Sequence, residues 1–276
     1  MTPRAITIDD QDRLYIVDKT ARIQVFDRDG NFIRSWRTPE NKQGKPCGLS
    51  ISQDGLLMVC DTHYFRVLFY TLDGNLVNER TIGGVNGRGP GEFGFLTDAV
   101  QDSKGNIYVS EYGDYDRIQK FTVNGEFVCQ WGEHGENPGQ FQRPQGMVID
   151  QHDQLWVADA SNGRIQVFDV SGQHPEFVKT WGKPGSKIGE LSYPYELILD
   201  GKGHIYVCEF GNHRIQKFTL DGKSLGIWGS AGRESGQLHQ PWSMCRDSQG
   251  AFHVVDSYNH RIQRFHFPEQ TDANLN

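Results

Sequence analysis

The hexapeptide ARIQVF at residues 21–26 returns along the chain as FRVLFY at 65–70, DRIQKF at 116–121, GRIQVF at 163–168, HRIQKF at 213–218 and HRIQRF at 260–265. The second residue of each copy is an arginine, and successive arginines are 44, 51, 47, 50 and 47 residues apart. Each copy is short, rich in β-branched and aromatic residues, and bounded by turn residues, which is the pattern of a β-strand. Six copies at a nearly constant interval predict a fold built from repeated sheets.

Each copy is the third of four short apolar segments. The segment before it ends in an acid, at Asp18, Asp61, Glu111, Asp159, Glu209 and Asp256. The first segment begins beside a proline in five repeats (Pro3, Pro46, Pro144, Pro194 and Pro241), with Leu96 in the sixth. The fourth ends in Trp-Gly at Trp131, Trp181 and Trp228, with Trp36 and Ile82 as variants. Four strands repeated six times, without helical periodicity, predict an all-β, six-bladed β-propeller of four-stranded antiparallel blades.

We expect this propeller to form a single domain over residues 1–276. The predicted repeats span approximately 3–45, 46–95, 96–143, 144–193, 194–240 and 241–267, with a tail at 268–276. The chain opens on a first-strand segment, PRAITID, and closes on a third-strand segment, RIQRFHF. The last blade is therefore predicted to lack its outer strand. We expect either a Trp-Gly strand upstream of Thr2 in a longer natural chain or a blade of three strands.

Bulk composition narrows the classes of partner. The net charge of −7 and a pI near 5.8 disfavour a broad phosphate-contacting surface for nucleic acid. No apolar run approaches the length of a membrane span, and no secretion leader precedes Pro3. A trimmed secreted or anchored precursor is compatible with this, so the compartment stays open. Cys60 and Cys208 share one register inside apolar strands and are expected to be buried thiols.

Three stretches resemble the NHL-repeat family: LWVADASNGRIQVF at 155–168, IYVCEFGNHRIQKF at 205–218 and the connector WGEHGENPGQFQRP at 131–144. The likeness recurs in register over residues 3–267. It implies a propeller of a kind that commonly serves as a protein- or RNA-binding platform. One enzymatic relative, the peptidyl-amidoglycolate lyase, holds a metal with histidines of its inner strands. No histidine occupies the first two inner-strand registers here, so that site does not carry over.

Antiparallel order places the long connectors at one end of every blade, around the channel mouth. The connectors span residues 37–46, 83–96, 132–144, 182–194 and 229–241. Beside them, repeats three and five depart from the other repeats in two ways. Each has an acidic residue near the start of its first strand, and each has a glutamate where the other repeats end their second strand in aspartate. This predicts an acidic, aromatic-edged cup formed by Arg4, Asp98, Glu111, Gln145, Tyr195, Glu196, Glu209 and Trp242. A shared duplication history or a local packing solution is the alternative.

The other shared residues are interpreted as structural, with the six arginines and their upstream acids forming loop-fixing ion pairs and the tryptophans packing blades together. We expect a monomeric, non-catalytic binding scaffold whose partner is a protein or peptide rather than a small molecule. RNA is disfavoured because the connector charges nearly balance. The alternative is a metal-dependent hydrolase or lyase, in which Asp98, Glu196 and Gln145 hold a divalent cation such as calcium. No catalytic residue is assigned, and no other cofactor is expected.

Overall fold

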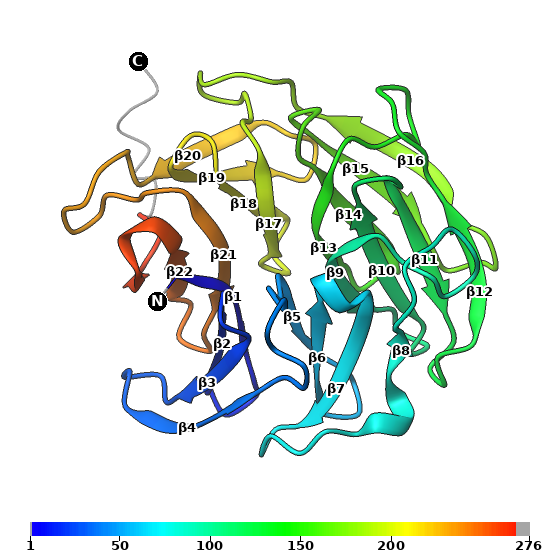
Figure 1. Ribbon diagram of the computed structural model, residues 1–276. Coiled ribbons are helices and arrows are strands. Elements are labelled where there is room, and N and C mark those ends of the chain that lie inside the picture. The colour runs from blue at the N-terminus through cyan, green and yellow to red at the C-terminus, as the bar shows by residue number, and fades with distance from the viewer. Residues whose placement is uncertain (1, 269–276) are drawn as a thin grey trace.

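The computed structural model describes residues 2–268, which form six antiparallel β-sheets around a central axis (Figure 1). The first three sheets contain β1 (Pro3–Ile8), β2 (Leu14–Asp18), β3 (Arg22–Phe26), β4 (Phe32–Arg37); β5 (Gly48–Ile51), β6 (Leu56–Asp61), β7 (Arg66–Thr71), β8 (Ile82–Gly83); and β9 (Phe95–Gln101), β10 (Ile107–Tyr112), β11 (Arg117–Phe121), β12 (Phe127–Trp131). The last three contain β13 (Pro144–Ile149), β14 (Gln154–Asp159), β15 (Arg164–Asp169), β16 (Glu176–Trp181); β17 (Pro194–Leu199), β18 (His204–Glu209), β19 (Arg214–Thr219), β20 (Ser224–Trp228); and β21 (Pro241–Arg246), β22 (Phe252–Asp256), β23 (Arg261–Phe265).

These sheets, numbered as blades one to six in chain order, confirm the predicted six-bladed β-propeller. The helices of the described part are three short 3₁₀ turns, η1 (Thr62–Tyr64), η2 (Asn78–Arg80) and η3 (Ser257–Asn259). None of them is long or apolar enough to cross a membrane. The first strand of each blade lies nearest the axis, and Figure 1 shows β1, β5, β9, β13, β17 and β21 surrounding it.

The ring closes where blade one meets blade six, with β1 beside β21 (Figure 1). The backbone N–H of Ile6 donates to the Ser243 hydroxyl at 3.3 Å. Between the β1–β2 turn and the β21–β22 turn, the Asp12 carboxylate accepts the Ser248 N–H at 2.9 Å and its hydroxyl at 2.6 Å. Blade six has three strands in residues 2–268, as predicted for the last blade. The predicted tail lies outside the described residues from position 269 onward.

Aromatic side chains fill the space between blades. In blades one, three, four and five, the tryptophan of the fourth strand packs on the aromatic residue that ends the motif of the next blade. The ring centroids lie 5.8 Å apart for Trp36–Tyr70, 5.9 Å for Trp131–Phe168, 5.0 Å for Trp181–Phe218 and 3.5 Å for Trp228–Phe265. This confirms the structural role expected for the tryptophans, because each one buries apolar surface that would be exposed to solvent on a single sheet.

The motif arginines fix the long connectors. All six form the predicted ion pairs, at 3.1 Å for Arg22–Asp18, 3.0 Å for Arg66–Asp61, 2.6 Å for Arg117–Glu111, 2.7 Å for Arg164–Asp159, 2.7 Å for Arg214–Glu209 and 2.8 Å for Arg261–Asp256. In blade four, the Arg164 guanidinium also donates to the carbonyls of Asn137 and Gln140, each at 2.9 Å. Charge-assisted bonds of this kind hold a loop that has no secondary structure of its own. The connectors are therefore a rigid platform.

Candidate functional site

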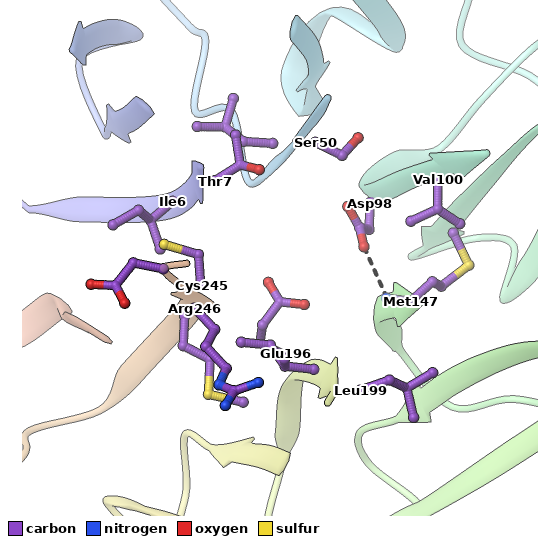
Figure 2. A pocket seen from close by; sticks show the side chains of 14 residues that line it. Ile6, Thr7, Ser50, Asp98, Val100, Met147, Glu196, Leu199, Cys245 and Arg246 are labelled. Carbon is purple, nitrogen blue, oxygen red and sulfur yellow. Dashed lines mark hydrogen bonds between the residues drawn. The ribbon is translucent and has the colours of Figure 1, made fainter. Parts of the chain in front are cut away.

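A cavity of about 340 Å³ lies inside the ring of inner strands. The carboxyl groups of Asp98 and Glu196 point into it from β9 and β17 (Figure 2). Arg246, the last residue of β21, and Asp247, which follows it, line its other end. The cavity therefore extends from the two carboxyls toward the short hairpin turns, away from the long connectors.

Glycines in alternate blades explain why the acids stand in blades three and five. A Cβ at Gly146 would lie 2.6 Å from the Tyr195 carbonyl and 2.7 Å from Glu196 Oε1. A Cβ at Gly48 would lie 2.9 Å from the Cα of Asp98. Each acid thus lies against a glycine of the preceding blade, and only glycine lets the two inner strands come so close. The first-strand acids of repeats three and five thus lie at close contacts between neighbouring inner strands.

Burial controls the charge of Asp98. Its carboxylate accepts the backbone N–H groups of Ala99 and Met147, both at 2.9 Å, and the residue is 7% exposed. Loss of hydration raises its pKa to about 7, and the two N–H groups oppose that rise without cancelling it. Asp98 is therefore poised to gain or lose a proton near neutral pH.

Glu196 is the more strongly perturbed of the two. Its carboxyl accepts the Leu197 N–H at 3.0 Å and the Ser243 hydroxyl at 2.9 Å. Burial raises its pKa well above the ordinary value, and the nearby charge of Asp98 raises it further. Burial and the charge of Asp98 thus both favour the protonated form of Glu196.

The mouth on the connector side is filled by arginines and aromatic rings. The Arg4 guanidinium lies 4.1 Å from the centroid of Trp242, whose ring meets Tyr195 at 5.0 Å. The Arg143 guanidinium lies 4.7 Å from the ring of Tyr112 and 5.8 Å from that of Tyr195. Both arginines also lower the pKa of these two tyrosines, against the larger upward effect of burial, so all of these groups share one local field. We call Arg4, Tyr112, Arg143, Tyr195 and Trp242 the mouth cluster.

The charge of the mouth differs from the predicted acidic cup. Glu111 and Glu209 are fully buried in ion pairs with Arg117 and Arg214, so they do not reach the mouth. Within residues 2–268, neither Arg4 nor Arg143 forms an ion pair, and neither Nε atom has a hydrogen-bond partner. The positive charge at the mouth is thus offset by aromatic faces rather than by carboxylates.

The structure therefore divides the eight predicted residues into three sets. Arg4, Tyr195 and Trp242 meet at the mouth, and buried Gln145 lies in the same register with its Nε2 unpartnered among the described residues. Asp98 and Glu196 lie one layer deeper, in the cavity. Glu111 and Glu209 belong to the loop-fixing ion pairs. Sequence reasoning missed Arg143, which stands just before the proline of blade four, where a left-handed φ of 59° sets its direction.

Metal ligation has few donors here. Among the described residues, no three or more His, Cys, Asp or Glu side chains gather in a group that could hold an ion. In the cavity, Asp98 and Glu196 are the carboxyls without a cationic partner, because Asp247 is paired with Arg264 at 2.9 Å and contacts His253 at 3.1 Å.

Comparisons with known proteins match this architecture. The family model described as "NHL repeat" matches residues 141–168, 197–218 and 238–265. Peptidylglycine alpha-amidating monooxygenase of Rattus norvegicus is 38% identical over 135 residues, 45% of this chain and 13% of that protein. NHL repeat-containing protein 3 of Homo sapiens is 29% identical over 160 residues, 55% of this chain and 46% of that protein. The matched part thus spans less than half of either relative's length.

Solved structures agree on the fold. A streptogramin B lyase superposes with a TM-score of 0.64 at 14% identity, covering 94% of this chain and 77% of the other. A virginiamycin B lyase from Staphylococcus aureus superposes with a TM-score of 0.62 at 15% identity, covering 92% and 91%. At such identities the likeness concerns the arrangement of the blades alone.

Proposed function

Because this chain is an NHL-repeat six-bladed β-propeller, we propose that its connector face is a platform that binds a protein or peptide. The fold provides the first support, since hydrogen bonds from the motif arginines hold the connectors that form this face. Binding loops that are held rigidly by their scaffold lose little conformational entropy when a partner binds. The opposite face consists mainly of short hairpin turns, which offer less contact surface.

The observation that carries the proposal is the mouth cluster. It combines two guanidinium groups that lack acidic partners in the described chain with three aromatic rings, contributed by five different strands or connectors. Arginine, tyrosine and tryptophan are the residues most enriched among the energetically dominant contacts of protein interfaces. A cluster of these three types at the centre of a rigid face is therefore the natural centre of an interface.

The charge of the cluster indicates what the partner presents. Arg4 and Arg143 would bind an anionic group, and planar guanidinium groups are well suited to carboxylates. The surrounding rings would hold an apolar or aromatic side chain beside that anion. The ligand class proposed is thus a peptide segment with an acidic residue or a free carboxyl terminus next to an apolar residue.

A peptide-display selection tests this proposal. Peptides selected on the wild-type protein are measured against the double variant Arg4→Gln/Arg143→Gln and against the charge-matched control Lys202→Gln/Lys223→Gln, whose lysines are exposed in hairpin turns of the opposite face. Hydrogen bonds to charged groups contribute about 1.5–3 kcal/mol, so the mouth variant should bind at least about tenfold more weakly. The control should bind like the wild type. Equal loss in both variants, or selected peptides without acids, contradicts the proposal.

A second candidate rests on the cavity. Asp98 and Glu196 line one cavity, where burial raises both pKa values and the charge of Asp98 raises that of Glu196 further, an arrangement that suits one carboxyl to act as an acid and the other as a base. This favours hydrolase or lyase chemistry there; a divalent cation such as calcium would bind these two groups only when both are ionised. Melting curves recorded with added calcium or zinc test the cation, since binding to the folded state raises the melting temperature with concentration. A rise that persists in Asp98→Asn/Glu196→Gln would place the ion elsewhere.

A further inference from the structure

The first connector, residues 37–46, differs from the other four in length and composition. It has ten residues, whereas the others have thirteen or fourteen. Its sequence, RTPENKQGKP, has no large apolar side chain, and residues 40–43 are all exposed. Each of the other four connectors has one apolar residue that is fully buried in the packing between blades, at Phe93, Phe141, Leu191 and Leu238. The first connector therefore lacks an apolar anchor.

A hydrogen-bonding side chain is missing as well. In blades three to six, the glutamine of the motif accepts a connector N–H and donates to a connector carbonyl. Gln166, for example, accepts the N–H of Gly139 at 2.9 Å and donates to the carbonyl of Gln140 at 2.7 Å. The equivalent residues are Gln119, Gln216 and Gln263. In blade two this position is the buried Leu68, which cannot form these bonds.

The acid of blade two is also incompletely bonded. In blades three to six, the carboxylate oxygen that faces away from the motif arginine accepts a connector N–H, from Gly94, Gln142, Ser192 or His239. The equivalent residue of the first connector is Gly44, and a Cβ there would lie 3.4 Å from Oδ1 of Asp61. This oxygen is buried and has no hydrogen-bond partner within residues 2–268. Gly44 thus covers a carboxylate oxygen without bonding to it, which is costly when the group is ionised.

Few contacts remain to hold the first connector. The Arg66 guanidinium donates to the Pro39 carbonyl at 3.4 Å and pairs with the exposed Glu40 carboxylate at 3.0 Å. The Gln43 N–H donates to the Tyr64 hydroxyl at 3.2 Å. Both holds come from one side chain each, and neither is supported by the glutamine and apolar contacts found in the other connectors. The first connector is therefore the least firmly held of the five.

We propose that the first connector is a lid beside the mouth, which opens in the folded protein when Asp61 is ionised and stays closed when Asp61 is protonated. The lid leads directly into Cys47, whose thiol accepts a hydrogen bond from Arg4 of the mouth cluster at 3.4 Å. Opening gives the carboxylate of Asp61 access to water, while the other four connectors stay closed. The proposal does not depend on what the mouth binds, because it concerns the free protein.

The direction of the pH dependence follows from the burial of Asp61. Burial raises its pKa to about 6, with Arg66 opposing the rise and the charge of Glu40 adding to it. Opening hydrates the carboxylate and returns its pKa toward the ordinary value of 3.8. The closed lid is therefore favoured most below about pH 4, and this preference is lost as the pH rises to about 6. The difference between the two pKa values allows the open fraction to rise by up to about a hundredfold.

The other titratable groups near Asp61 and Arg66 are Glu40, Cys60, Tyr64 and Tyr70. Burial raises the pKa of the Cys60 thiol and of the Tyr70 hydroxyl, and the charge of Asp61 raises both further. Both groups are therefore neutral throughout the interval in which Asp61 titrates. Glu40 is the other carboxyl in this set, so the test must separate its effect from that of Asp61.

Proteolysis at Glu40 measures the opening. A glutamate-specific protease is added to the native protein near pH 4.5 and near pH 7.5, and a free peptide of residues 36–47 corrects for the protease's own pH dependence. Relative to this peptide, cutting at Glu40 should be at least about tenfold faster at the higher pH. Glu136 and Glu234 are matched controls, because they are equally classed as exposed but lie in fully held connectors. Both should be cut more slowly than Glu40 at the higher pH.

A variant identifies the group responsible. Asp61→Asn removes the charge, so cutting at Glu40 should become slow and independent of pH, whereas Asp159→Asn, at the same position of blade four, should leave cutting at Glu40 unchanged. If the charge of Glu40 set the pH dependence, Asp61→Asn would retain it, and the proposal would be wrong. Equal cutting of the wild type at Glu40, Glu136 and Glu234, or faster cutting at Glu40 at the lower pH, also overturns the proposal. These wild-type comparisons need no variant to fold.

Discussion

Replacing Glu196 with glutamine should remove about half of the pH dependence that the channel carboxyls give to folding stability between pH 5 and 7. In the folded protein, burial raises the pKa of Asp98 from 3.8 to about 7 and that of Glu196 well above its ordinary value. In the unfolded chain both groups are hydrated and ionise near pH 4. Between pH 4 and its raised pKa, each of these carboxyls holds a proton in the folded protein that it has lost in the unfolded chain. The stability of the folded protein must therefore fall as the pH rises.

The magnitude follows from this difference in bound protons. Each carboxyl that is protonated only in the folded protein changes the free energy of unfolding by about −1.4 kcal/mol per pH unit. The two together therefore change it by about −2.7 kcal/mol per pH unit near pH 6. For Asp98, the interval from 3.8 to about 7 corresponds to about 4 kcal/mol. This contribution is fully present below pH 4 and is lost once the pH passes about 7. Glu196→Gln keeps the shape of the side chain, and the Ser243 hydroxyl can rotate to accept from the new amide.

Urea denaturation followed by tryptophan fluorescence at pH 5, 6 and 7 measures these slopes. The slope of Glu196→Gln should be shallower than that of the wild type by about 1.4 kcal/mol per pH unit. Glu126→Gln, which changes an exposed glutamate, should keep the wild-type slope. Equal slopes for Glu196→Gln and the wild type would refute the reasoning, because Glu196 would then be ionised in both states.

Three further outcomes follow from contacts in the ring. Arg117→Ala leaves the fully buried carboxylate of Glu111 without its partner and should lower the free energy of unfolding by about 3–5 kcal/mol. Arg261→Ala should lower it less, because the Arg261 side chain is 32% exposed, and urea denaturation of both variants measures the difference. Gly146→Ala should lower it by about 1–3 kcal/mol because its Cβ overlaps a backbone carbonyl, whereas Gly172→Ala should have little effect on the melting temperature. Among the five cysteines, Cys47 alone is not buried, so a thiol reagent should label one site per native molecule; several fast-reacting sites would contradict the burial of the others.

Much of the fold could be predicted because the same sequence pattern occurs in six copies along the chain. The arginine register located every third strand, and the Trp-Gly ends located the outer strands of blades three to five. The three strands that blade six has within residues 2–268 could also be predicted, since PEQTDANLN after RIQRFHF lacks the apolar character of a fourth strand. Periodicity and turn residues suffice for these features because they depend on local chain geometry and on burial of sheet faces.

The candidate site could be predicted only in part. Register placed Arg4, Tyr195 and Trp242 at one mouth, but it could not reveal that Asp98 and Glu196 enter the cavity beside glycines of the preceding blades. That arrangement depends on contacts between residues about 50 positions apart. The charge of the mouth was missed for a related reason. Glu111 was assigned to the cup although its own repeat motif commits it to Arg117.

Hydrogen–deuterium exchange on the complex with a selected peptide tests the central claim most directly. If the connector face is the binding platform, the peptide should slow exchange at the starts of the inner strands, around residues 4–6, 143–147, 194–197 and 242–244. Exchange in the hairpin turns of the opposite face, such as 101–106 and 200–204, should stay the same. Protection confined to those turns, with the mouth unchanged, would contradict the account.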